Sequence, residues 1–373
     1  MTAARREGAD TSPPALSHSE QDVMSDKPLW EPDDRDGVRA YHELSKHAFG
    51  RYAPGPASLD WDAQPDPFRR FDGCPRVPLP LAAGRVDIPF SALHDPTSLP
   101  VQPMCADTLG AFLELSLAIS AWKSLGPARW AVRCNPSSGN LHPVEAYLVL
   151  PQTDLGPAGL YHYEAQAHSL ERRCTFDAVL ARRLAERLPA GCLLLGLSLI
   201  PWREAWKYGV RAWRYCQLDL GHAIGALGYA AACNGWQVRV LTHWPTKTLS
   251  RLLGLDRSAD FEPDEPEYPA ALLVLGPQPG DLPPQEAWLD VMDAQVWQGK
   301  ANRLDPRHLY RWDAVDEMAG LCTPPAVAAG PIAAGRPAFA PPPGDPPAAD
   351  VIRRRRSARG FDPRHSIDSG MFF

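Results

Sequence analysis

Two hydroxyls, a glycine and an amide gather in one short stretch of the chain, residues 133–143, which reads RCNPSSGNLHP. Small polar side chains on a glycine-containing turn between prolines can bring backbone N–H groups close to a flat polar ligand. Such a stretch is equally ordinary turn chemistry, so a plain surface loop is the competing interpretation. The candidate ligand contacts are Arg133, Pro136, Ser137, Ser138 and Asn140.

A second stretch with reactive side chains is residues 206–215, which read WKYGVRAWRY. On a helix, Lys207, Arg211 and Arg214 lie at i, i+4 and i+7 and form one cationic stripe beside Tyr208. A lysine removed from water among aromatic rings and other cations can act as a base near neutral pH, and a neighbouring tyrosine can relay a proton. The competing interpretation is an amphipathic helix whose long basic side chains reach into solvent.

A third stretch, residues 353–361, contains four consecutive arginines and ends in the spacing Arg355, Ser357, Arg359. Guanidinium groups suit a dianionic phosphate, and a serine hydroxyl adds a neutral donor. Basic runs are also found as solvated faces or nucleic-acid-binding tails. The formal net charge of −6 provides no electrostatic reason to expect nucleic-acid binding.

These three stretches resemble motifs of the nitroreductase superfamily, in its SagB-type dehydrogenase and azoline-oxidase branch. The resemblance implies that the turn reaches a flavin, commonly one bound mainly by the other half of a dimer. It also implies that Arg355, Ser357 and Arg359 hold the phosphate and ribityl chain of FMN. Finally, it implies that Lys207 and Tyr208 remove a proton during azoline oxidation and that Arg211 and Arg214 of the same stretch contact the cofactor.

The resemblance implies an FMN-dependent oxidoreductase that moves hydride between flavin and a small molecule or a peptide azoline. NAD(P)H is the candidate electron donor, and the substrate stays open between nitro or quinone compounds and azolines. The alternative is a degenerate, non-catalytic half that binds a partner or acts as a scaffold. It is favoured by residues 94–100, HDPTSLP, where the family would place an arginine motif. No motif for a metal, ATP or a Rossmann-type dinucleotide occurs.

Composition shifts predict the domain organisation. Residues 1–36 are expected to be a disordered leader, 37–300 a nitroreductase-like domain, 301–350 a linker rich in proline and alanine, and 351–373 the start of a second, truncated unit. A tandem arrangement of this kind predicts either a homodimer or an intramolecular pseudo-dimer within a longer chain.

Hydrophobic periodicity predicts an α+β fold in which helices, one of them long, flank a mixed or antiparallel sheet. Helices are expected at 38–49, 108–124, 177–188, 205–234 and 247–253. Strands are expected at 145–150, 159–163, 193–200, 237–241 and 270–275. His142 and His222, the histidines nearest the motifs, are interpreted as structural rather than catalytic.

The bulk properties predict a cytoplasmic globular protein. The chain has 373 residues, of which 45% are hydrophobic and 22% charged. Its eight cysteines lack the spacing of a metal site, which favours a reducing compartment. The N-terminal region has no apolar signal segment, and polar residues interrupt the most apolar stretch, 218–236, so no membrane span is predicted.

Overall fold

A computed structural model describes residues 34–284, 286–305, 307, 311–322, 344–358, 360–364 and 366. The predicted leader lies outside this set up to residue 33, as do 323–343 of the predicted linker and Arg359. No helix in the described ranges is long and apolar enough to cross a membrane.

The centre of the fold is a seven-stranded antiparallel sheet with the strand order β2-β7-β6-β5-β8-β10-β9. The five strands expected from the sequence are all present, and the α+β class is confirmed. The strands are β2 Arg76–Pro78, β5 Val144–Leu150, β6 Gly159–Glu164, β7 Ser169–Thr175, β8 Leu193–Leu199, β9 Gln237–Val240 and β10 Tyr268–Gly276. A small separate sheet pairs β1 Phe71–Asp72 with β11 Lys300–Ala301.

Strands β5 and β8 are buried along their whole length because both faces of the sheet are covered. Successive side chains of a strand point to opposite faces. Thus Leu195 and Leu197 pack into one apolar cluster, and Leu194 packs into another. A strand covered on both faces is mostly apolar, as residues 146–150 of β5 and 193–197 of β8 are.

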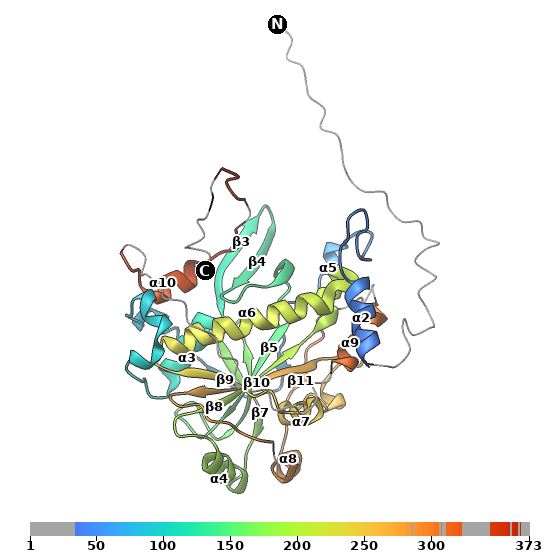
Figure 1. Ribbon diagram of the computed structural model, residues 1–373. Helices are drawn as coiled ribbons and strands as arrows, with labels where there is room; N and C mark the ends of the chain where they lie inside the picture. Colours follow the sequence, from blue (N-terminus) through green and yellow to red (C-terminus); the bar gives the residue numbers. More distant parts are fainter. Residues whose placement is uncertain are drawn as a thin grey trace.

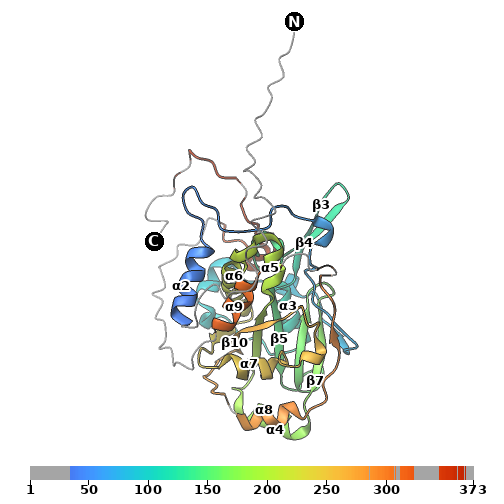
Figure 2. The ribbon, with the colours of Figure 1, turned by 90° about the vertical axis from the view of Figure 1, so that its right-hand side faces the viewer.

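Helices surround this sheet, and Figure 1 shows α6 crossing it with α3 alongside. Figure 2 shows α2 and α9 next to α6 on the same side of the sheet. The helices are α2 Asp34–Leu44, α3 Ala106–Ser116, α4 Ala178–Arg187, α5 Pro201–Tyr208, α6 Ala212–Ala232, α7 Thr246–Leu253, α8 Glu286–Asp293, α9 Asp313–Leu321 and α10 Ala348–Arg354. Short 3-10 helices are η2 Trp61–Ala63, η3 Ala83–Arg85, η4 Phe90–His94, η5 Pro96–Ser98, η6 Ser138–Asn140, η7 Gly209–Arg211 and η8 Ser258–Asp260.

The helix expected at 108–124 is wrong in its second half. Helix α3 ends at Ser116, and a hairpin of β3 Ile119–Leu125 and β4 Ala128–Arg133 follows. Gly126 has a φ of 56° in the turn, a conformation that favours glycine. Both views show this hairpin projecting beyond the main sheet (Figures 1 and 2).

The long helix expected at 205–234 is broken into two. Gly209 adopts a φ of 54° and a ψ of −132°, which ends α5, and α6 then runs for 21 residues. A Cβ on Gly209 would lie 2.6 Å from the Cα of Gly55, so the extended arm of residues 50–60 approaches closely only because glycine is there. The long core helix is therefore confirmed, but Lys207 and Tyr208 belong to a separate short helix before it.

One helix, α9, falls within the range predicted as a linker, 301–350, and α10 begins at the end of that range. Helix α9 buries Ala314, Val315 and Met318, and α10 buries Ala348 and Ala349. Such alanine-rich turns have too little hydrophobicity to stand out beside the prolines around them, yet they pack because alanine allows close approach. Helix α10 contacts α3 and η4, so the segment that begins at 344 lies directly on the first unit.

Candidate functional site

The turn at 134–143 connects the hairpin strand β4 to the central strand β5. Gly139, Asn140 and His142 all have positive φ values, which bend the chain tightly between two strands. The side-chain amide of Asn140 donates to the carbonyl oxygen of Ala131 at 2.7 Å. The Oδ1 atom of Asn140 lies 3.2 Å from Nε2 of His142. The amide expected to contact a ligand therefore holds the shape of the turn.

The two serines of the turn bind a carboxylate from helix α6. The hydroxyls of Ser137 and Ser138 donate to Asp219 at 2.8 and 2.9 Å, and the backbone N–H of Ser138 lies 2.9 Å from both carboxylate oxygens. The Ser137 oxygen also accepts from the N–H of His142 at 2.8 Å. Asp219 is fully buried, so these contacts compensate for removing it from water. The residues around Asp219 in the sequence do not indicate this role.

Lys207 and Tyr208 lie against the same turn. A Cβ built on Gly139 would be 2.7 Å from the Tyr208 hydroxyl and 3.0 Å from Cδ of Lys207. Glycine at this position is therefore required both by its φ of 57° and by the two side chains that cover it. Two of the three stretches singled out in the sequence meet here.

Aromatic rings surround the lysine. The Lys207 ammonium lies 5.8 Å from the centroid of the Trp61 ring and 5.7 Å from that of Tyr208. The Tyr208 and Tyr215 rings are 4.4 Å apart. Burial, with the nearby Glu204 carboxyl second, raises the pKa of Tyr208 to about 12. Tyr208 therefore keeps its proton at neutral pH, and its hydroxyl can donate a hydrogen bond.

Arg211 and Arg214 point toward the N-terminal helix α2 and the residues after it. Arg211 donates to the Tyr215 hydroxyl at 3.0 Å and lies 2.5 Å from Nε2 of His47. Arg214 donates to the carbonyl of His42 at 3.0 Å and to the hydroxyl of Ser45. Because the helix breaks at Gly209, the continuous cationic stripe expected from the sequence does not form.

Arg133 and Pro136 occupy the first half of the turn. The Arg133 guanidinium is buried, donates to the carbonyl of Pro67 at 2.6 Å and lies 5.5 Å from the Phe68 ring. Pro136 is half-buried. Arg133 thus holds the extended arm near residue 67 against the turn.

Arg355 reaches the turn from helix α10. Its guanidinium donates to the carbonyl oxygen of Cys134 at 3.0 Å. Arg355 is half-buried, whereas Ser357 is exposed. The third residue of this motif, Arg359, lies outside the described residues. The described part of the third sequence stretch therefore meets the first one.

A second buried carboxyl, Glu204, lies on α5 one turn before Lys207. Its side chain is fully buried. Within the described chain, neither of its carboxyl oxygens has a hydrogen-bond partner. Burial, and then the nearby Asp219 carboxylate, raises the pKa of Glu204 well above its usual value. In the sequence, Glu204 is simply a glutamate among the aromatic residues of α5. Its burial cannot be told from the sequence, because a surface glutamate would look the same.

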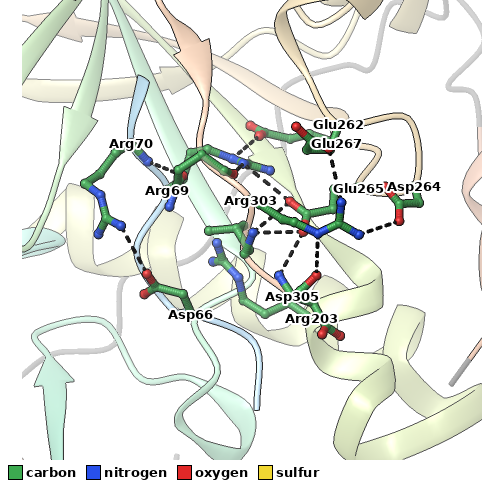
Figure 3. A network of polar contacts seen from close by, with 12 residues as sticks. Asp66, Arg69, Arg70, Arg203, Glu262, Asp264, Glu265, Glu267, Arg303 and Asp305 are labelled. Carbon is green, nitrogen blue, oxygen red and sulfur yellow. Dashed lines mark hydrogen bonds and ion pairs between the residues drawn. The ribbon is translucent and has the colours of Figure 1, made fainter. Parts of the chain in front are cut away.

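A buried ionic network adjoins the turn, and Figure 3 shows the part of it around Arg69. Arg69 lies 3.4 Å from Glu267 and 3.8 Å from Glu265, with all three side chains removed from water. Tyr147 donates to Glu267 at 2.7 Å. Arg203, also labelled in Figure 3, pairs with Glu145 at 2.8 Å and donates to the carbonyl of His142. The network thus holds the far end of the turn in place.

His162 carries a charge in this network. Its ring nitrogens lie 3.5 Å from Glu145 and 3.1 Å from Glu171. Burial alone would lower the pKa of His162, but the contacts with Glu145 and Glu171 outweigh it and raise the pKa to about 9. His162 is therefore an imidazolium at neutral pH.

The assembled groups can transfer protons and bind anions. Four side chains that can carry protons surround one end of the turn, and the guanidinium of Arg355 lies at the other end. The four are Lys207, Tyr208, Glu204 and Asp219. No group of three or more histidine, cysteine or acidic side chains in the ranges that the structure covers could hold a metal ion.

No protein-family model matches the sequence, and no curated protein matches it. Solved structures do resemble the chain. A candidate nitroreductase from Anabaena variabilis is 24% identical with a TM-score of 0.47, and the match covers 64% of this chain. The chain spans about half the length of that protein, 46%.

A candidate nitroreductase from Ralstonia eutropha is 18% identical with a TM-score of 0.40, covering 62% of this chain and 99% of that one. The microcin synthetase McbBCD complex of E. coli, with truncated pro-MccB17 bound, is 17% identical with a TM-score of 0.37. That match covers 74% of this chain and 85% of the other.

Proposed function

We propose that this chain is an FMN-dependent oxidoreductase that transfers hydride between the flavin and a small-molecule or peptide-azoline substrate. The observation that carries this proposal is the convergence on one turn. Lys207 and Tyr208 cover Gly139, while Arg355 contacts the carbonyl of Cys134 five residues earlier. Groups suited to proton transfer and a group suited to phosphate therefore lie at opposite ends of a short polar segment.

The donors on the turn fit the flavin in part. Arg355 uses one of its N–H groups on Cys134, and its remaining donors are available for a phosphate. Ser357 and Arg359 would complete that phosphate site. The hydroxyl hydrogens of Ser137 and Ser138 point to Asp219, so these serines would offer the flavin only oxygen lone pairs and backbone.

The other residues predicted to contact the cofactor instead contact the protein itself. Arg133 and Asn140 each donate a hydrogen bond to a backbone carbonyl, and Pro136 restricts the backbone between them. Arg211 and Arg214 bind the N-terminal helix region and keep the arm near Lys207. We infer that these residues position the flavin-facing surface.

Lys207 is the proposed proton acceptor, and Tyr208 the donor that orients the substrate. When bound, FMN would supply the hydride acceptor or donor. In azoline oxidation, the Lys207 amine removes a proton from the carbon next to the one that loses hydride. In nitro or quinone reduction, with NAD(P)H as the donor of electrons, the same groups return a proton.

A second copy of the chain is the proposed partner, packed on the outer face of α6. Leu218 and Tyr229 are 56% and 47% exposed there. Between them, Gly221, Gly225 and Gly228 have open space where a Cβ would be, so another helix could approach closely. Light scattering tests this: a Gly225→Trp variant should be monomeric if the wild type is a dimer, and a monomeric wild type removes the proposal.

The rival function is a non-catalytic binding or scaffold module. One observation favours it, because the serine hydroxyls are already used by Asp219. A protein of this kind would keep its fold without flavin and would show no turnover.

Flavin content tests the proposed function. The purified chain should be yellow, should release FMN on denaturation and should bind added FMN with a measurable stoichiometry. Lys207→Ala should retain FMN and lose turnover, whereas the matched control Lys247→Ala, an exposed lysine on α7, should keep it. A colourless protein that takes up no FMN supports the rival, and full activity of Lys207→Ala removes the base assignment.

A further inference from the structure

Two carboxyl groups lie behind the Lys207–Tyr208 pair in different environments. Glu204 is fully buried, and no described residue hydrogen-bonds to either of its carboxyl oxygens. Asp219 is also fully buried, but three donors from Ser137 and Ser138 surround its carboxylate. A buried carboxylate without donors is costly, whereas one with several hydrogen bonds is stabilised. The geometry therefore places the charge on Asp219 and a proton on Glu204.

The two groups also act on each other. The nearby Asp219 charge is the second cause, after burial, that raises the pKa of Glu204. Two carboxyls that share a buried site do not both ionise readily, and environments that push their pKa values apart assign an acid and a base. Burial also raises the pKa of Asp219 above its usual value, and the hydrogen bonds from Ser137 and Ser138 reduce that rise without cancelling it.

Glu204 lies near Lys207 without hydrogen-bonding to it in the described chain, so the two side chains must approach for a proton to pass between them. The two residues are three positions apart on α5, a spacing that puts side chains on neighbouring parts of one helix face. Lys207 is also among the charges that act on Glu204. Arg203, the adjacent cation, is held by Glu145 at 2.8 Å and does not hydrogen-bond to Glu204.

We propose that Glu204 and Asp219 form a carboxyl pair that stores one proton on Glu204 and exchanges it with the substrate through Lys207. In the reductive direction the Lys207 ammonium gives a proton to the substrate and becomes an amine. The Glu204 carboxylic acid then protonates that amine, and the resulting carboxylate faces the restored ammonium. In the oxidative direction the same proton moves in reverse. The exchange with substrate depends on the proposed function, whereas the stored proton does not.

Other titratable groups face Glu204 from both helices that enclose it. They are Arg203, Lys207 and Tyr208 on α5, and Cys216 and Asp219 on α6. Burial raises the pKa of Cys216 well above its usual value and that of Tyr208 to about 12. Both groups therefore stay protonated and uncharged at neutral pH.

The stored proton can be tested without flavin, by the pH dependence of stability. A carboxyl whose pKa is raised on folding stabilises the protein below its unfolded pKa and less as the pH rises. We expect the wild type to lose thermal stability between pH 5 and 8 relative to Glu204→Gln, whose amide resembles the protonated acid. The exposed Glu186→Gln on α4 is the control and should follow the wild type. Parallel curves for wild type and Glu204→Gln would overturn the proposal.

Infrared spectroscopy gives a second measurement if Glu204→Gln does not fold. The wild type at neutral pH should show the carbonyl stretch of a buried carboxylic acid, which shifts on deuteration and is assigned with Glu204→Asp. Absence of that band would mean that the pair holds no proton.

Turnover tests the exchange with substrate. With FMN bound and a nitroaromatic or quinone as probe, Glu204→Gln should lose about tenfold or more in kcat and lose the alkaline fall of the pH profile. Flavin retention should not change. The control Asp316→Asn, a half-buried carboxyl on α9 that lies 3.4 Å from the Tyr268 hydroxyl, should keep both.

The two failures are distinguishable. A wild type that binds no FMN removes the proposed function, and the stability and infrared measurements still decide whether Glu204 holds a proton. A flavin-loaded Glu204→Gln with wild-type kcat and pH profile removes the exchange while leaving the oxidoreductase proposal intact.

Discussion

Arg355 donates a hydrogen bond to the carbonyl oxygen of Cys134 at 3.0 Å, although 221 residues separate them. Helix α10 makes this contact possible because Ala348 donates to the carbonyl of Ile88 and anchors the segment to the first unit. The contact brings a guanidinium to the start of the polar turn, where the proposed phosphate site would lie.

Arg355→Ala should weaken FMN binding about tenfold, or about 1.4 kcal/mol, and should lower stability by about 1 kcal/mol. Fluorescence titration and urea unfolding measure the two effects. The neighbouring Arg354 is 80% exposed and pairs only with Asp350 among the described residues, so Arg354→Ala is the control and should change stability by less than about 0.5 kcal/mol. Equal effects of the two variants would contradict the role given to Arg355.

Gly139→Ala should reduce both stability and turnover. Gly139 and Gly126 have nearly the same φ, 57° and 56°, but only Gly139 has neighbours where a Cβ would go. Gly126→Ala should cost about 1 kcal/mol from backbone strain alone. Gly139→Ala should cost more, since its methyl group would displace the Tyr208 hydroxyl. Chemical denaturation and steady-state kinetics compare the two, and identical losses would argue against the contact with Tyr208.

Asp219→Asn should destabilise the protein by about 2 kcal/mol, because donors of Ser137 and Ser138 lose their charged acceptor. In a double-mutant cycle, Ser138→Ala should cost much less in the Asp219→Asn background than in the wild type. Additive losses would show that the serines and Asp219 act independently.

Stability should fall at alkaline pH through His162. Its folded pKa of about 9 lies above the unfolded value, so its contribution is complete below about pH 6.5 and is lost as the pH rises through 9. Urea unfolding between pH 7 and 9.5 should show a steeper loss for the wild type than for His162→Gln. A wild type that is equally stable at both ends of that range, relative to the variant, would mean that His162 is neutral in the folded protein.

Much of the sheet can be predicted from the sequence. The strands β5 and β8 contain apolar runs at 146–150 and 193–197, and such runs are what a doubly covered sheet demands. The strand β7 escapes this reasoning because its buried Glu171 and Arg173 are compensated by distant partners. The local sequence pattern cannot show that a buried charge is paired when its partner is brought near only by the tertiary fold.

The site shows the same division. The residue types alone single out Lys207, Tyr208 and the two serines as candidates. Their convergence depends on the helix break at Gly209, whereas hydrophobic periodicity predicts one continuous helix there. Asp219 and Glu204 go unnoticed because their importance lies in what surrounds them.

The buried ionic network in Figure 3 constrains how this protein can evolve. Arg69 is the cation between Glu265 and Glu267, and all three side chains are removed from water, so losing Arg69 would leave two carboxylates without their cation, a loss of about 3–5 kcal/mol. Replacing several members together by apolar residues carries no such penalty. In lineages that share this fold, these positions should therefore change in concert, and their substitutions should be strongly epistatic.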